Sequence, residues 1–428
     1  MLTEPRIELI PARHAVCSDE PVVLDVLIRV TPPQPEVHFP RAPLNLALVL
    51  DRSGSMSEGK KMQFAREAAA FAVKQLLLTD RVSVTTFDSE VETIVPGGPP
   101  ADKAALVRRI EQIAPRGSTD LHGGWAEGGR QAEAGFIFGG INRVLLLSDG
   151  LANKGVVDPN TIATEARALA ARDVSTTTIG VGDDYNEDLM EAMARAGDGH
   201  YYYIESPVQL VDMFQTELQG LMDTLGQKVS LGVEPAAGVA IGEVLNDFDR
   251  TTTGRLMLPN LVVDMPLYIV VRLKLPPLSA GTKLLEVRLA WDAPKGGGRR
   301  VLHATLGHLP ALPLSAWSTV PDDPEVGSQV ALLMAARAQK EAALAAERGD
   351  MQTTKQYLYL AREAASSVPS SAETQLELAA LSDLETALES GQHQHFIKSS
   401  KFRAYSRRQS RPSKPNEPPA KEDGSKIQ

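Results

Sequence analysis

The sequence lacks the features that mark secreted and membrane proteins. Its 428 residues include one cysteine, Cys17, so no intrachain disulfide bond can form. The first residues lack the basic segment and the long apolar stretch of a secretory signal peptide. The stretch nearest to a membrane span, residues 261–278, is interrupted by prolines and charged residues, and it falls short of the roughly 18–20 apolar residues that cross a bilayer. These absences predict a cytoplasmic protein without a membrane span, unless a non-standard route exports it.

The motifs of common enzyme classes are also missing. The sequence has no Gly-x-x-x-x-Gly-Lys-Ser/Thr phosphate-binding loop and no His-Glu-x-x-His zinc motif. It has no nucleophile elbow, no paired catalytic carboxylates and no Cys/His grouping. We therefore predict that the protein is not an enzyme, and that any ATPase motor that works with it is a separate chain.

Charge is distributed unevenly along the chain. The formal net charge of −10 favours solubility and argues against general nucleic-acid binding. Residues 391–428 nevertheless contain nine Lys and Arg against three Asp and Glu, with few apolar residues, so we predict a disordered basic tail. Within it, residues 407–410 (Arg-Arg-Gln-Ser) resemble the target of a basic-directed Ser/Thr kinase. An anionic membrane surface, nucleic acid and the acidic body of the same chain are the alternative contacts of this tail.

Residues 44–225 have the pattern of an α/β domain. Strand-like apolar runs alternate there with helical periodicity, which predicts a doubly wound, mostly parallel sheet. The predicted strands are residues 44–50, 81–87, 91–95, 144–147, 175–181 and 201–204. The predicted helices are approximately residues 60–78, 101–113, 121–134, 159–171, 187–195 and 207–221.

The segments on either side of this domain read differently. Residues 1–43 and 226–308 contain strand patterns separated by Gly, Pro and Asn. Because the two strands at the front make a poor unit alone, we predict that both segments pair in one β-sandwich that carries the α/β domain as an insertion. A proline-rich linker (residues 309–323) and a helical hairpin with one further helix (residues 324–390) precede the tail.

An oxygen-rich motif follows the first predicted strand of the α/β domain. Asp51, Ser53 and Ser55 come directly after the apolar run, Thr119 lies in a loop before a helix, and Asp149 ends a later strand. Ligands of open α/β sheets bind beyond the carboxyl ends of the strands, and hard cations such as Mg²⁺ bind oxygen ligands of this kind. The competing interpretation is that these residues serve only turns and helix caps.

These five residues resemble the metal-ion-dependent adhesion site (MIDAS) of von Willebrand factor type A (VWA) domains, in the same order and approximate spacing. The resemblance covers about residues 44–222, and the layout of the chain is similar to that of bacterial multidomain members of the family. It implies that Ser53 and Ser55 bind the ion through their hydroxyls, and that Thr119 binds directly or through water. Asp51 and Asp149 are then expected to hold coordinated waters and the serine hydroxyls.

The resemblance implies a protein-binding function. We predict a Mg²⁺-dependent interaction scaffold, with Mn²⁺ or Ca²⁺ as alternative ions, whose partner supplies an Asp or Glu to the metal. An ion that retains waters and few protein carboxylates stays electron-poor, so an incoming carboxylate can complete its octahedron. The alternative is an adaptor subunit for a separate AAA+ ATPase that inserts metals or remodels complexes. A surface adhesin or channel-associated protein is disfavoured by the missing signal and membrane spans.

Overall fold

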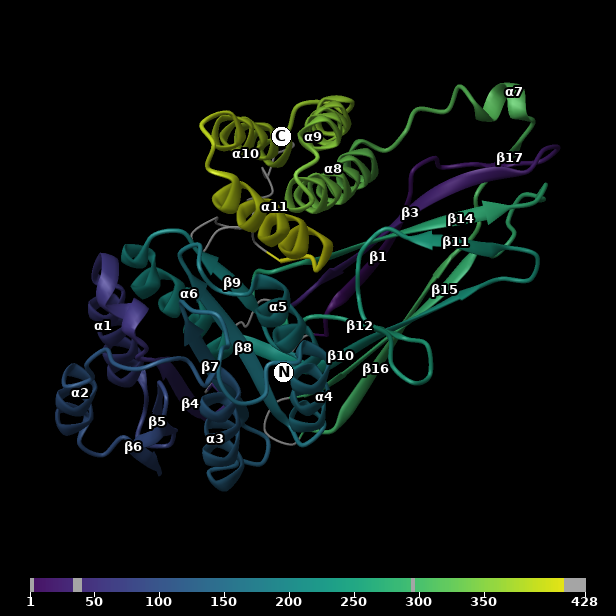
Figure 1. The fold of residues 1–428 in the computed structure, drawn as a ribbon. Coiled ribbons are helices and arrows are strands. Elements are labelled where there is room, and N and C mark those ends of the chain that lie inside the picture. Colours follow the sequence, from purple (N-terminus) through teal and green to yellow (C-terminus); the bar gives the residue numbers. More distant parts are fainter. Residues whose placement is uncertain (1–3, 34–40, 294–296, 412–428) are drawn as a thin grey trace, which may run out of the picture. The chain divides into compact units, whose positions relative to one another are not determined.

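The computed structural model describes residues 4–33, 41–293 and 297–411, and the chain divides into two compact units (Figure 1). One unit comprises residues 41–224 of the described chain. The other unit is made of the segments before and after it in the sequence. The first unit is therefore an insertion within the second.

The inserted unit is built on a six-stranded sheet in the order β6-β5-β4-β7-β8-β9, in which the β5–β6 pair is antiparallel and the other pairs are parallel. The central strands β4 and β7 are buried along their whole length, as expected for strands that helices cover on both faces. The strands are β4 (Leu44–Asp51), β5 (Arg81–Phe87), β6 (Val91–Gly98), β7 (Ile141–Ser148), β8 (Val174–Val181) and β9 (Tyr201–Ile204).

Helices lie on both faces of this sheet (Figure 1). Helices α1, α2 and α6 share one apolar core with the sheet, and α3, α4 and α5 lie on the opposite face. Helix α3 approaches β4 closely, because a Cβ on Gly128 would lie 2.2 Å from Cγ2 of Val49. The helices are α1 (Lys61–Gln75), α2 (Lys103–Glu111), α3 (Leu121–Ala134), α4 (Pro159–Ala170), α5 (Glu187–Ala196) and α6 (Leu210–Met222), with 3₁₀ turns η1 (Gly54–Lys60) and η2 (Pro207–Gln209).

The second unit contains two sheets that share one apolar core. Strand β3, from the front segment, pairs antiparallel with β14, from the rear segment, along the whole of β14. The first sheet is β1 (Arg6–Pro11), β3 (Val22–Thr31), β14 (Leu267–Leu275) and β11 (Ala240–Val244). The second is β12 (Leu256–Met257), β10 (Thr224–Pro235), β15 (Leu285–Asp292) and β16 (Arg299–Leu306), with β13 (Leu261–Val262) beside β10. The predicted fold class, an α/β domain set in a β-sandwich and followed by helices, is confirmed.

The stretch expected to be a linker is a packed part of this unit. Strand β17 (Ala311–Leu312) pairs with β2 (Val16–Cys17), and helix α7 (Leu314–Trp317) follows. Trp317 is buried, its Nε1 donates to the Ala15 carbonyl at 2.9 Å, and the Arg13 guanidinium lies 4.3 Å from its ring centroid. Proline-rich composition was therefore a poor guide here, because one buried aromatic ring anchors the segment.

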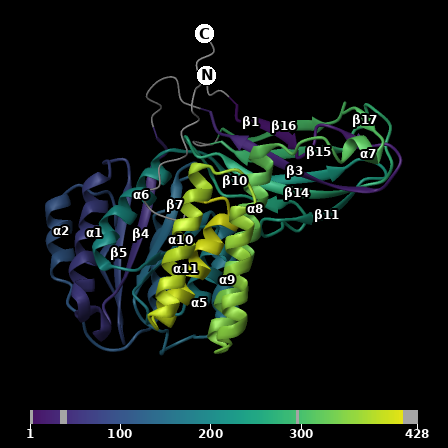
Figure 2. The same cartoon turned by 90° about the horizontal axis from the view of Figure 1, so that it is seen from above.

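Helices α8 (Pro324–Glu347), α9 (Met351–Ser366), α10 (Ala372–Glu389) and α11 (His393–Arg408) complete the unit (Figure 2). Helix α8 lies on the outer face of the first sheet, where Val326 and Leu333 pack with Leu27 and Val270. Among the residues that the structure describes, no helix is both long and apolar enough to cross a membrane.

The prediction of a disordered tail from residue 391 is wrong for residues 393–408, which form α11. Phe396 and Ile397 are buried in the core that α8, α9 and α10 share. The composition is polar, but two apolar side chains complete a core whose remaining surface comes from the other helices. The rest of the predicted tail, residues 412–428, lies outside the described residues.

Candidate metal site

Three loops converge at the carboxyl edge of the six-stranded sheet. Asp51 is the last residue of β4, and Ser53 and Ser55 lie in the turn that enters η1. Thr119 lies just before α3, and Asp149 follows β7 directly. The side chains of Asp51 and Asp149 are fully buried, and Ser53 and Thr119 are nearly so. The loops that carry these five residues thus meet at the edge where the parallel strands end.

Hydrogen bonds join four of the five predicted residues. Ser55 Oγ donates to Asp149 Oδ1 at 2.7 Å, and the Ser53 and Ser55 hydroxyl oxygens are 3.1 Å apart. The backbone N–H of Ser53 donates to Asp51 Oδ1 at 2.7 Å. The two serines therefore stand between the two carboxylates.

Thr119 borders the same space. A Cβ placed on Gly150 would lie 3.2 Å from Thr119 Oγ1, 3.7 Å from Ser55 Oγ and 3.8 Å from Asp51 Oδ2. All five residues that the sequence singled out are thus brought together around one point. That they bind a metal ion stays a prediction.

The donor set fits a hard divalent cation. Ser55 gives its one hydroxyl hydrogen to Asp149, so one lone pair of its oxygen accepts from the Ser53 hydroxyl and the other can contact an ion. Ser148 Oγ donates to Asp51 Oδ2 at 2.5 Å and fixes that carboxylate as well. Hydroxyl and carboxylate oxygens, without His or Cys, are the ligands of Mg²⁺, Mn²⁺ and Ca²⁺.

The electrostatics favour a cation. Burial, together with repulsion from Asp149, raises the pKa of Asp51 to about 6, against the lowering effect of hydrogen bonds from Ser148 and Ser53. A buried carboxylate with a raised pKa lacks a compensating positive charge. A divalent ion at this edge of the sheet would supply that charge.

Three residues that sequence reasoning did not assign to the site also contact its members. Lys61 Nζ donates to Asp149 Oδ2 at 2.7 Å. Asn153 accepts from the Thr119 N–H through its side chain at 3.0 Å and donates its own N–H to the Thr119 carbonyl at 3.2 Å. Ser148, which precedes Asp149, contacts Asp51 as described above. The available signal was position, because each follows a strand end or begins a helix at this edge.

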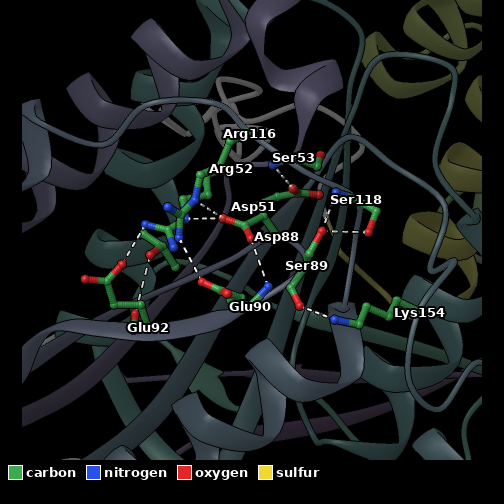
Figure 3. Close-up of polar contacts among 11 residues, drawn as sticks. Asp51, Arg52, Ser53, Asp88, Ser89, Glu90, Glu92, Arg116, Ser118 and Lys154 are labelled. Atoms are coloured by element: carbon green, nitrogen blue, oxygen red, sulfur yellow. Dashed lines mark hydrogen bonds and ion pairs between the residues drawn. The ribbon is translucent and has the colours of Figure 1, made fainter.

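Arg52 connects the loop of residues 51–55 to two neighbouring loops through hydrogen bonds (Figure 3). Its Nε donates to Asp88 Oδ2 at 2.6 Å and its Nη1 to Glu92 Oε2 at 2.9 Å, and its carbonyl accepts from the Arg116 N–H at 2.6 Å. Burial acts to raise the pKa of the Asp88 carboxyl, but hydrogen bonds from Arg116, the Glu90 amide and Arg52 hold it below its usual value. Each carboxylate of this cluster thus has an arginine partner, which Asp51 lacks among the described residues.

Polar and aromatic residues at the start of α3 have structural partners. His122 Nε2 lies 2.9 Å from Glu165 Oε2, and Trp125 is buried with its Nε1 donating to Thr176. Asp120 caps α3 through the Gly123 N–H.

The candidate kinase site lies at the end of α11. Ser410 Oγ accepts from the Tyr268 N–H at 2.8 Å, so its hydroxyl is engaged with β14 in the folded unit. Gln409 donates through its side chain to the Asp247 carbonyl, and Arg408 forms an ion pair with the Asp247 carboxylate. A kinase acting on Ser410 stays a prediction.

The sequence profile of the von Willebrand factor type A domain matches residues 45–216. These residues form a VWA domain. The protein YfbK of Escherichia coli is 30% identical over 191 residues, which cover 44% of this chain and 33% of YfbK. The protein sll0103 of Synechocystis is 27% identical over 282 residues, which cover 62% of this chain and 65% of sll0103. The chain thus spans less than two thirds of each relative.

The fold extends beyond the VWA domain in two solved structures. A von Willebrand factor type A protein from Catenulispora acidiphila matches with a TM-score of 0.66 and 17% identity, over 93% of this chain and 90% of that one. The ArnB paralogue VWA2 from Sulfolobus acidocaldarius matches with a TM-score of 0.60 and 18% identity, over 94% of this chain and 99% of that one. VWA domains often bind a divalent metal at a MIDAS and mediate protein–protein interactions.

Proposed function

We propose that the VWA domain is a Mg²⁺-dependent, non-catalytic module that captures an acidic side chain of a partner protein. The observation that supports this most directly is the arrangement of Ser53, Ser55 and Thr119 between two buried carboxylates. The three hydroxyls would bind the ion, and Asp51 and Asp149 would hold its waters. Mn²⁺ and Ca²⁺ are the alternative ions.

In this proposal the side chains of the protein hold the ion in place, and the ion binds the carboxylate of the partner. When bound, the ion offers an open coordination position that attracts a carboxylate. Ser148 and the Ser53 N–H occupy both oxygens of Asp51, and Ser55 and Lys61 occupy both oxygens of Asp149. These donors fix the orientation of both carboxylates, and the remaining lone pairs of their oxygens would hold the waters of the ion.

Affinity capture with the full chain tests this proposal. We expect wild type to bind Mg²⁺ by calorimetry and to retain its partner in Mg²⁺ but not in EDTA, whereas Asp51→Ala loses both. Glu58→Ala is the matched control, because it removes an exposed carboxylate from the same loop. A partner that is an AAA+ ATPase would establish the adaptor form of the function. Capture that survives both EDTA and Asp51→Ala would refute the proposal.

A further inference from the structure

A lysine lies inside the candidate metal site. Lys61 is the first residue of α1, and its side chain is only 11% exposed. Its Nζ is 2.7 Å from Oδ2 of the fully buried Asp149. A Cβ on Gly182, in the loop after β8, would lie 3.6 Å from Cε of Lys61, so the side chain is enclosed on that side too. A buried ammonium beside a site that suits a cation calls for a reason.

The contact determines what Asp149 can do. Its Oδ1 accepts from Ser55 and its Oδ2 accepts from Lys61, so each oxygen already has a partner. A carboxylate held in this way orients the serine hydroxyl, and a metal ion that approached either oxygen directly would have to share it with one of these donors. Without the lysine, Oδ2 would be left buried and unpaired, and a metal ion would be its natural partner.

The contact also determines the charge of the site. Asp51 and Asp149 contribute two negative charges, and Lys61 contributes one positive charge. Arg52 adds no excess positive charge, because it is paired with both Asp88 and Glu92. A divalent ion therefore leaves the loaded site with a positive charge in excess, whereas the same site without the lysine is neutral.

We propose that Lys61 sets the class of ligand that this site accepts. It keeps Asp149 off the metal and leaves the loaded site positive, so that the site binds a carboxylate at the expense of affinity for the metal. This inference rests on the proposed function, since it assumes that the site binds a divalent ion.

The proposal predicts two effects of opposite sign. Lys61→Met removes a like charge from beside the ion and frees Asp149 to bind it, so we expect metal affinity to rise about tenfold. The neutral site should then bind a carboxylate about tenfold more weakly. A lysine that merely supports the fold would weaken both interactions when it is removed.

The test uses Mn²⁺ as the metal and acetate as the carboxylate, with the full-length chain. Water proton relaxation reports both Mn²⁺ binding and the number of waters on the bound ion. We expect acetate to displace water from wild-type Mn²⁺, and we expect Lys61→Met to bind Mn²⁺ more tightly with fewer waters and a weaker acetate response. Lys61→Arg should behave as wild type, since it keeps the charge. Lys60→Met is the matched control, because it removes an exposed charge one residue away.

The outcomes separate the inference from the proposed function. Weaker Mn²⁺ binding by Lys61→Met, or unchanged acetate binding, overturns the role of Lys61 and leaves the metal site standing. Equal Mn²⁺ binding by wild type and Asp51→Ala overturns the metal site, and the inference with it. Lys61→Gln, which loses the charge but keeps a hydrogen-bond donor, carries the same prediction if Lys61→Met does not fold.

Discussion

Two buried carboxylates of the VWA domain have opposite surroundings. Glu217, on α6, accepts from Thr177 Oγ1 and Tyr202 OH at 2.8 Å each and lies 2.9 Å from His200 Nδ1. Burial acts to raise the pKa of Glu217, but His200, Arg143 and Thr177 outweigh it and hold the pKa well below its usual value.

Asp51 shows the contrary balance. It has hydrogen-bond donors but no cation, and burial raises its pKa to about 6. One domain thus contains a carboxylate whose charge is satisfied from within and another whose charge is not. The first stabilises the fold, and the second is where the proposed metal ion would supply the missing positive charge.

Breaking the satisfied cluster should give the largest effect. Glu217→Ala removes the carboxylate that faces the buried Arg143 and the partly buried His200, and we expect it to destabilise the domain by about 3–5 kcal/mol. Hydrogen exchange of amides in β4 and β7 measures this locally, which is needed because a chain of two units need not melt as one. Thr216→Ala, on the same helix, is the control. A loss below about 1 kcal/mol would mean that the cluster contributes little.

Removing the charge of Asp51 should have the opposite effect and stabilise the metal-free domain. The folded-state pKa of Asp51 lies above its unfolded value, so without metal the domain loses stability as pH rises from about 4 to about 6, and the loss is complete above that range. Asp51→Asn should therefore raise the metal-free stability at pH 7 by up to about 3 kcal/mol. Hydrogen exchange of β4 at pH 4 and pH 7 checks this, since the gain should be small at pH 4 and nearly complete at pH 7. Destabilisation at pH 7 would contradict this assignment.

Protons and metal ions should compete for the same site. Because metal binding requires the ionised carboxylate, Mg²⁺ affinity should fall as pH is lowered through about 6, by about tenfold for each further unit. Calorimetric titrations between pH 5 and pH 8 measure the slope. A flat profile across that range would separate Asp51 from the metal site.

Breaking the ion pairs of Arg52 beside the site should have the smallest effect. Arg52→Met removes the contacts to Asp88 and Glu92 that fix the loop of Ser53, and we expect Mg²⁺ affinity to fall about tenfold. Arg116→Met is the control. Arg116 contacts the same Asp88, but its side chain is 55% exposed, so its loss should lower Mg²⁺ affinity less. Equal affinity in wild type and Arg52→Met would show that the loop holds itself in place.

The sequence predicted the parts of the site that are local in the chain. Asp51, Ser53 and Ser55 fall within five residues after an apolar strand, and Asp149 directly follows another, so periodicity alone places them at one edge. The pairing of Lys61 with Asp149 was beyond reach, because 88 residues separate them and only packing of α1 against the β7 loop brings them together.

The helical end of the chain shows the same limit from the other side. Composition predicted disorder after residue 390, yet α11 forms there. Most of its residues are polar or basic, and its few apolar residues carry little helical signal. Phe396 and Ile397 lie in the core shared with the other helices, and Phe402 and Tyr405 are buried as well. Tertiary contacts with α8, α9 and α10 decide its structure, and such contacts are not written in a local pattern.

The most direct test of the contrast is the effect of Mg²⁺ on the stability of the VWA domain at pH 7. Hydrogen exchange of β4 is measured for wild type and Asp51→Asn, each with Mg²⁺ and with EDTA. We predict that Mg²⁺ slows exchange in wild type and leaves Asp51→Asn unchanged. No effect on wild type, or an equal effect on both proteins, would contradict the account that the buried Asp51 charge is there to be met by a metal ion.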